Sequence, residues 1–164
     1  MKSDLQDLIR PHYLEMKGYV SAGMESGKNH DLVFMNANES PYSLPGQEGL
    51  NQYPEQQPPE LVRLMAQAYE TKPEYILVSR GADEALDMMT QVFCEPHKDA
   101  VLIHSPTFGM YAVNAAAMPA KVVDVPLVKG QGTYNLDTRG MIDAALNPDN
   151  RVKIVYLCSP NNPT

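Results

Sequence analysis

One stretch decides the fold of this chain: Val152-Lys153-Ile154-Val155-Tyr156-Leu157-Cys158-Ser159-Pro160-Asn161-Asn162-Pro163-Thr164. The residues before Ser159 are mostly β-branched, aliphatic or aromatic, which is the pattern of a strand buried on both faces. Two prolines then prevent the strand from continuing. In open parallel sheets, ligands bind just beyond the carboxyl ends of the strands. The carboxamides of Asn161 and Asn162 are therefore candidates for ligand binding, although a turn whose amides bond only their own backbone has the same sequence.

Upstream of this strand the hydrophobic pattern switches repeatedly between the strand and helix periods. The predicted strands are residues 75–78, 100–104, 121–125 and 152–158. One predicted helix begins at Pro59, and three more span residues 82–93, 108–117 and 138–146. This alternation is typical of an α/β domain with a mainly parallel sheet and right-handed crossovers.

Residues 1–35 are predicted to form an arm in front of this domain. A short amphipathic helix, broken at Pro11, is followed by a Gly/Ser-rich stretch and a short strand from Leu32 to Met35. The segment from Asn36 to Pro59 is rich in Pro, Gly, Asn and Gln and is too long for an idle connection. Loops of this length are usually functional or mobile.

The composition excludes several classes of protein. With 164 residues and 43% hydrophobic side chains, the chain is long enough for one domain with a core. The net charge of -7, without a Lys/Arg run, argues against a nucleic-acid partner. Acidic residues near the start argue against a signal peptide, and the lack of a long apolar run argues against a membrane span. A soluble, cytoplasmic protein is therefore expected.

The two cysteines, Cys94 and Cys158, lie in apolar segments without metal-ligand spacing. They are predicted to be reduced core thiols, with a disulfide between them as the less favoured alternative. His104 has no second His or carboxylate at ligand spacing, and it is expected to cap a strand end. No metal site is therefore predicted.

A glycine turn opens the helix predicted at residues 82–93. The sequence Ser79-Arg80-Gly81-Ala82-Asp83-Glu84 follows a predicted strand. This arrangement points free backbone N–H groups and the positive end of the helix dipole beyond the strand, where a phosphate would bind. It is neither a Walker loop nor a G-x-G-x-x-G fingerprint. The alternative is an ordinary helix start in which Asp83 and Glu84 complement the dipole.

Aromatic residues follow the strand at 100–104. Phe108 and Tyr111 either present a face on which a planar heterocycle stacks or pack within the helix that they begin. Three successive strand ends thus offer a phosphate cradle, an aromatic face and a pair of carboxamides. Together they describe a pocket for a flat, phosphorylated cofactor, and pyridoxal phosphate fits that description.

Five motifs carry a resemblance to a known family: Asn36-Ala37-Asn38-Glu39-Ser40-Pro41-Tyr42, Gln52-Tyr53-Pro54-Glu55, Ser79-Arg80-Gly81-Ala82-Asp83-Glu84, Pro106-Thr107-Phe108-Gly109-Met110-Tyr111 and Cys158-Ser159-Pro160-Asn161-Asn162-Pro163-Thr164. The chain resembles the N-terminal part of pyridoxal-phosphate-dependent aminotransferases of class I/II, most closely the histidinol-phosphate aminotransferases. The resemblance implies an aspartate-aminotransferase-like large domain with helices on both faces of the sheet. Residues 36–164 would be the first half of that domain, and residues 1–35 would be an arm that belongs to the small domain and the dimer contact.

The resemblance also implies roles for the residues that would bind the cofactor. Gly81, Ala82 and Asp83 would bind the phosphate of pyridoxal 5'-phosphate, largely through backbone N–H groups. Phe108 would stack on the pyridine ring, and Asn162 would form a hydrogen bond with the phenolic oxygen. The family more usually carries Tyr in place of Phe108, so stacking is the only role expected there.

Residues of the arm and the long loop are implicated in the same way. Tyr53 resembles the residue that reaches the phosphate of the neighbouring subunit in a homodimer, which would explain how the long loop is ordered. Asn38 and Tyr19 match positions near the substrate, although Tyr19 could equally pack within the arm.

The implied activity is amino transfer between histidinol phosphate or imidazole-acetol phosphate and glutamate or 2-oxoglutarate, in histidine biosynthesis. The Schiff-base lysine of the family lies beyond Thr164, so the chain alone is expected to be inactive and to need the remainder of the same enzyme. Two alternatives stay open. One is another amino-acid aminotransferase or a phospho-amino-acid decarboxylase of the same fold, and the other is a non-catalytic α/β fragment that binds phosphate or a partner chain.

Overall fold

The computed structural model describes residues 5–19, 35 and 37–164, and these form two compact units. One unit combines the described residues up to Met16 with Ser79–Thr164, and the other contains those of Lys17–Val78. The proposed boundary at residue 35 stays a prediction. The predicted strand from Leu32 lies outside the described residues except for Met35, which belongs to no strand. None of the described helices is both long and apolar enough to cross a membrane.

A three-stranded parallel sheet forms the centre of the first unit. Its order is β2 (Lys121–Asp124), β1 (Ala100–Ile103) and β5 (Val152–Val155). β1 pairs with a neighbour on each edge and is buried at all four positions, because helices also cover the two faces from which its side chains project. Its purely apolar sequence suits this central place.

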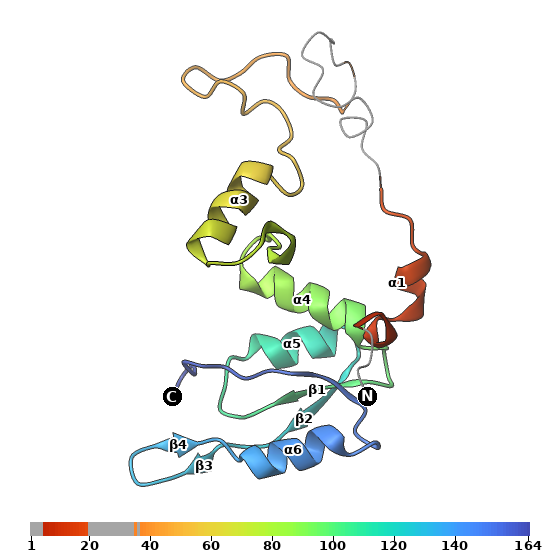
Figure 1. Cartoon of the computed structure of the whole chain (residues 1–164), viewed down its shortest axis with the longest axis vertical. Coiled ribbons are helices and arrows are strands. Elements are labelled where there is room, and N and C mark those ends of the chain that lie inside the picture. Colours follow the sequence, from red (N-terminus) through yellow and green to blue (C-terminus); the bar gives the residue numbers. More distant parts are fainter. Residues whose placement is uncertain (1–4, 20–34, 36) are drawn as a thin grey trace. The chain divides into compact units, whose positions relative to one another are not determined.

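Helices cover both faces of this sheet (Figure 1). α4 (Ala82–Phe93) and α5 (Met110–Ala117) lie on one side, and α6 (Thr138–Leu146) lies on the other. The chain runs from β1 outward to β2 and then back across the sheet to β5. Crossovers between parallel strands are almost always right-handed, and under that rule the reversal accounts for α5 and α6 lying on opposite faces. The predicted α/β architecture is confirmed.

The core lies between the sheet and the helices α4 and α5. Leu86 and Phe93 of α4 pack against it. Thr90, which is fully buried in α4, donates to the carbonyl of Leu86 at 2.9 Å and lies 3.2 Å from the Tyr156 hydroxyl. The buried members of the core are Cys94, Val101, Ile103, Ala115, Ala120, Ile154 and Tyr156.

Several element bounds differ from the sequence-based ones. α4 and α6 have the predicted bounds, whereas α5 begins at Met110 and β5 ends at Val155. Beyond β5 the pairing continues, since the N–H of Tyr156 donates to the carbonyl of Leu102 at 2.9 Å. The sequence analysis missed a short antiparallel hairpin, β3 (Val128–Lys129) and β4 (Tyr134–Asn135).

The second unit contains the helix α3 (Pro59–Ala68), which confirms the predicted start, and the 3-10 helix η2 (Pro73–Tyr75). The predicted strand at residues 75–78 is wrong. Residues 76–78 belong to no strand, and among the described residues the backbone N–H and C=O of Val78 pair with the side chain of Gln57 instead of a neighbouring strand.

The N-terminal residues of the first unit form η1 (Leu5–Leu8) and α1 (Pro11–Glu15). Pro11 therefore starts a helix instead of breaking one, because the first helical position needs no N–H donor. The preceding Arg10 attaches this segment to α4. Its backbone N–H donates to the Val92 carbonyl at 3.0 Å, and its guanidinium donates to the Gln91 carbonyl at 2.8 Å and to Glu95 at 3.2 Å. A cation at a helix C-terminus is favourable.

Both cysteines are free thiols, as predicted, but only Cys94 is fully buried. Burial, reinforced by the charge of Asp99, raises the pKa of the Cys94 thiol to about 11. The partly buried Cys158 has a lowered pKa, chiefly because the Tyr111 hydroxyl donates a hydrogen bond to its sulfur and the backbone of Asn162 adds a second. Burial raises the pKa of Tyr111 to about 12, so this hydroxyl keeps the proton that it donates.

Replacement of Leu102 by Ala should lower the free energy of unfolding by about 2–5 kcal/mol, because it leaves a cavity in a fully buried strand. Urea unfolding followed by circular dichroism measures this change. The control is Leu146→Ala at the exposed end of α6, which should change the free energy by less than about 0.5 kcal/mol. Equal effects of the two substitutions would contradict the central position of β1.

Iodoacetamide at pH 8 should alkylate Cys158 at least about tenfold faster than Cys94 in the folded protein, since only the thiolate reacts. The raised pKa of Cys94 leaves very little thiolate at that pH, whereas the lowered pKa of Cys158 increases its thiolate fraction. Peptide mass spectrometry over time gives both rates. In urea the two rates should converge, and a difference that persists after unfolding would contradict this explanation.

Candidate functional site

The loops after β1 and β5 meet at the carboxyl edge of the sheet, because these two strands are parallel neighbours. Asn161 joins the loops: its Oδ1 accepts from the Thr107 hydroxyl at 3.0 Å, and its Nδ2 donates to the Pro106 carbonyl at 2.9 Å. Its Nδ2 also contacts the Thr164 hydroxyl. Asn161 therefore bridges two segments far apart in sequence, unlike an amide that bonds only its own turn.

The two adjacent asparagines differ in what their side chains do. Asn161 is partly buried and uses its carboxamide for the bonds between the loops, whereas Asn162 is exposed. Within the described residues, no hydrogen bond engages the Asn162 side chain. Its donor and acceptor are thus available to a ligand at the carboxyl edge, which is where the sequence analysis expects one.

Phe108 stands at the end of a row of aromatic rings. It contacts Tyr111 edge-on, with ring centroids 5.6 Å apart, and Tyr111 stacks on Tyr156 at 4.5 Å. Tyr156 belongs to the core. Phe108 itself is only partly buried. It is therefore supported by helix packing, while its role as a stacking platform for a heterocycle stays a prediction.

The first turn of α4 faces the same edge of the sheet. Cys94, at the other end of α4, contacts the carbonyl of Ala100 where β1 begins. α4 thus runs against the strand direction, and its N-terminus points toward the carboxyl edge. Among the described residues no side-chain cap is made at this N-terminus, whose N-cap residue is Gly81, so its first N–H groups have no acceptor from a cap.

The turn before α4 depends on a glycine. Gly81 has φ +80° and ψ 174°, a conformation that only glycine adopts without strain. The turn is closed by two short bonds, from the Gly81 N–H to the Ser79 carbonyl at 2.8 Å and from the Ser79 hydroxyl to the Gly81 carbonyl at 2.9 Å. These bonds fix the shape of the turn that directly precedes the backbone N–H groups of Ala82 and Asp83.

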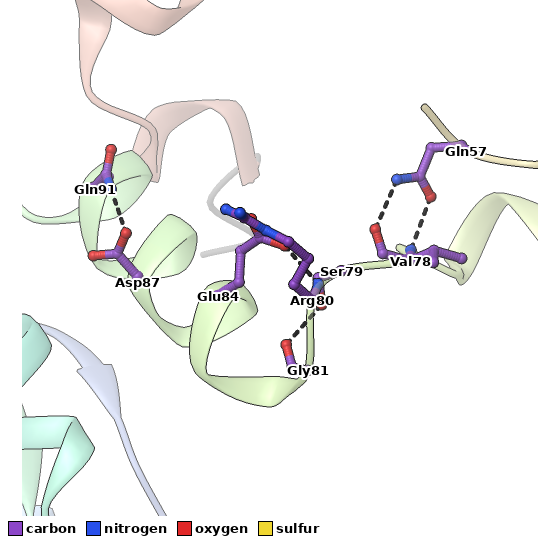
Figure 2. Close-up of polar contacts among 8 residues, drawn as sticks. All are labelled: Gln57, Val78, Ser79, Arg80, Gly81, Glu84, Asp87 and Gln91. Atoms are coloured by element: carbon purple, nitrogen blue, oxygen red, sulfur yellow. Dashed lines mark hydrogen bonds and ion pairs between the residues drawn. The ribbon is translucent and has the colours of Figure 1, made fainter. Parts of the chain in front are cut away.

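Glu84 is paired with Arg80, as Figure 2 shows. The Arg80 guanidinium donates to Oε1 of Glu84 at 2.6 and 2.8 Å, and the Arg80 backbone N–H donates to Oε2 at 2.6 Å. The hydrogen bond from Arg80 lowers the pKa of Glu84. The charge of this carboxylate is thus paired with a cation, so its repulsion of a phosphate near the helix start would be reduced.

In the second unit, Asn38 and Tyr53 line one small hollow of about 330 Å³. Glu39 connects them, because it follows Asn38 in sequence and its carboxylate accepts the backbone N–H of Tyr53 at 2.8 Å. Tyr53 is 75% exposed. Tyr19 is also exposed and does not line this hollow. The remaining residues that line it are Ser40, Leu50, Asn51, Gln52 and Pro54.

Polar bonds within the loop hold it in shape. Asn51 donates to the Ser40 carbonyl at 2.8 Å and accepts from the Ser43 hydroxyl at 2.7 Å. Gln57 pairs with both backbone groups of Val78. The resemblance implied that a neighbouring subunit orders this loop. The hydrogen bonds of Asn51 and Gln57 within the chain were not predicted from the sequence. No local motif marks them, because each partner is many residues away.

His104 is buried at the end of β1, and its Nε2 accepts the backbone N–H of Cys158 at 3.2 Å. It thus ties β1 to the chain after β5, in keeping with the predicted capping role. A larger hollow of about 800 Å³ lies beside His104, the β3–β4 hairpin and Asn161, and none of the predicted cofactor residues lines it. Among the described residues there is no group of three or more His, Cys, Asp or Glu side chains that could hold a metal ion.

Comparison with known proteins gives the family. Residues 24–164 match the model of aminotransferase class I and II. The chain is 40% identical over 159 residues to a histidinol-phosphate aminotransferase of Xylella fastidiosa, covering 96% of this chain and 42% of that protein. It therefore spans less than half the length of this relative.

Solved structures agree with this match. N-succinyldiaminopimelate aminotransferase from Mycobacterium tuberculosis superposes with a TM-score of 0.62 at 31% identity, over 71% of this chain and 31% of that one. Histidinol-phosphate aminotransferase from Sinorhizobium meliloti, in complex with pyridoxal-5'-phosphate, shares the fold with a TM-score of 0.58 at 21% identity, over 69% of this chain and 29% of that one. Since the family model covers most of the sequence and the parallel sheet with its flanking helices agrees with it, the chain belongs to the aminotransferase class I and II family.

Proposed function

We propose that the chain forms the N-terminal part of a pyridoxal-phosphate-dependent enzyme that transfers an amino group between histidinol phosphate or imidazole-acetol phosphate and glutamate or 2-oxoglutarate. The name of the Xylella relative supports this choice of substrates. The observation that carries the proposal is the division between the two asparagines, which leaves the Asn162 side chain available at the carboxyl edge while Asn161 fixes the loops. The enzyme is proposed to act in the cytoplasm as a homodimer.

The residues present fit the cofactor. The uncapped N–H groups of Ala82 and Asp83, behind the open turn at Gly81, suit a phosphate. The exposed surface of Phe108 suits one face of a pyridine ring. Asn162 would donate through Nδ2 to the phenolic oxygen, where a charge-assisted bond both binds and orients the ring. When bound, pyridoxal phosphate supplies the electron sink of amino-transfer chemistry, and the protein supplies orientation and electrostatics.

The long loop is proposed to serve the phosphate and the substrate. Tyr53, with an exposed ring on a braced backbone, would donate its hydroxyl to the cofactor phosphate of the partner subunit. Asn38, from the same hollow, would contact the substrate, as would Tyr19. The family's catalytic lysine has no counterpart within this chain by resemblance, so we propose that the remainder of a longer enzyme supplies it.

The direct test of this function uses the longer protein that contains this chain. Purified with pyridoxal phosphate and given glutamate and imidazole-acetol phosphate, it should form histidinol phosphate and 2-oxoglutarate, both measurable by mass spectrometry. The M. tuberculosis structure favours a second candidate, another aminotransferase with a different amino acceptor. Cofactor binding with amino transfer from N-succinyldiaminopimelate, and none with histidinol phosphate or imidazole-acetol phosphate, would establish that second candidate instead.

Replacement of Asn162 by Ala should weaken cofactor binding by about 10- to 100-fold, because a hydrogen bond to a charged group contributes about 1.5–3 kcal/mol. Absorbance titration of the cofactor-free enzyme with pyridoxal phosphate measures the Kd. Asn135→Ala in the exposed hairpin is the matched control and should leave the Kd unchanged. An unchanged Kd in Asn162→Ala would remove this residue from the site.

Mixed dimers test whether Tyr53 acts on the partner subunit. Subunits carrying Tyr53→Phe are combined with subunits carrying Asn162→Ala. If Tyr53 serves the opposite subunit, one site of each mixed dimer has both wild-type residues. Half of all the sites in the mixed dimers should then bind cofactor with wild-type affinity. If Tyr53 serves its own subunit, every site is defective. Tyr42→Phe, in the same loop and also exposed, is the control that should need no complementation.

A further inference from the structure

The side chain of Gln57 takes the place of a β-strand beside Val78. Its Nε2 donates to the Val78 carbonyl and its Oε1 accepts the Val78 N–H, both at 2.8 Å (Figure 2). These two bonds are the pair that a residue in a neighbouring strand would exchange with Val78. A carboxamide combines a donor and an acceptor in one rigid plane at every ordinary pH. Glutamate lacks the donor at neutral pH, and an aliphatic side chain lacks both.

Each end of the segment from Tyr53 to Gln57 is fixed by such a bond. At one end, Glu39 holds the backbone N–H of Tyr53 at 2.8 Å. At the other, Gln57 holds Val78, which is 21 residues further along the chain. Val78 is followed directly in the sequence by Ser79, the first residue of the Gly81 turn. That turn has its own closing bonds, and we expect a displacement of Val78 to be passed on to it through the peptide bond between Val78 and Ser79.

We propose that Gln57 is a positioning residue for cofactor binding, which couples the loop of Tyr53 to the phosphate-binding turn at Gly81. The inference rests on the proposed function, because it concerns the same cofactor. If Tyr53 serves the partner subunit, Gln57 links the phosphate turn of one site to the tyrosine of the other. Loss of the Gln57 carboxamide should then weaken phosphate binding at both cofactor sites of the dimer.

The experiment compares Gln57→Glu with Gln57→Leu in the longer protein, with Gln56→Glu as the matched control in an adjacent exposed position. Hydrogen exchange of a peptide that contains Val78, in the cofactor-free protein, reports whether the two bonds exist. Titration with pyridoxal phosphate at pH 7.5 and pH 5.5 reports the coupling, with each Kd divided by the wild-type value at the same pH.

At pH 7.5 both Gln57 variants should exchange the Val78 amide faster and bind the cofactor about tenfold more weakly, whereas Gln56→Glu should match the wild type. At pH 5.5 the Glu variant should recover part of its affinity. A protonated carboxyl group again donates and accepts, and the Val78 carbonyl, which repels the carboxylate, raises the pKa of the new side chain. Gln57→Leu should show no recovery, so a recovery confined to Glu distinguishes positioning from a general loss of packing.

Three results would overturn the proposal. Faster exchange at Val78 with an unchanged Kd would reduce Gln57 to a local brace. Equal behaviour of the Glu and Leu variants at pH 5.5, with both folded by circular dichroism, would exclude the hydrogen-bonded pair as the cause. Unaltered exchange in both variants would show that the pair does not form. Failure of the wild-type protein to bind pyridoxal phosphate would instead refute the proposed function, and the exchange measurement would still stand.

Discussion

β1 is hydrogen-bonded to a parallel strand on each edge, and every one of its residues is buried. Parallel pairing on both sides requires crossovers, and right-handed crossovers in opposite directions put α5 and α6 on different faces. The same pairing brings the loops after β1 and β5 to one edge, where Phe108 and Asn162 lie. Tyr156, just past β5, stacks on Tyr111, which in turn supports Phe108. The geometry of the candidate site is therefore a consequence of how one short apolar strand is paired.

Polar groups around the site fall into those that build it and those left for a ligand. The carboxamide of Asn161 is hydrogen-bonded to Thr107 and Pro106, and the carboxylate of Glu84 is hydrogen-bonded to Arg80. Among the described residues, the groups that stay unengaged include the exposed Asn162 side chain and the first turn of α4, as well as the buried Nδ1 of His104 and Nδ2 of Asn114. Most buried polar groups have a partner in the protein, whereas exposed groups are also open to a ligand. The Asn162 side chain and the first turn of α4 are the groups that we propose to serve the cofactor.

Sequence reasoning succeeded where the determining signal is local. α4 and α6 have the predicted bounds because their apolar period is clear and because Gly81 and Asp137 mark their starts. It failed at residues 75–78, whose apolar run resembles a strand, because a strand also needs a partner and Val78 has a side chain instead. Asn162 and the Gly81 turn could be predicted because neighbouring prolines and a glycine mark these places as turns in the sequence. Glu39 and Gln57 could not, since their partners lie 14 and 21 residues away and no pattern connects them.

The loop around Tyr53 keeps its shape through side-chain hydrogen bonds, while Tyr42, Leu44, Leu50 and Tyr53 stay exposed. Opening such a segment uncovers little additional apolar surface. Heat capacity and denaturant sensitivity both scale with the surface uncovered on unfolding. Local opening of this loop therefore has a small heat-capacity change and a small dependence on urea, unlike the opening of the α/β unit. On cooling, the core loses part of its hydrophobic stabilisation, whereas the loop does not, so the two parts of one chain follow different stability curves with temperature.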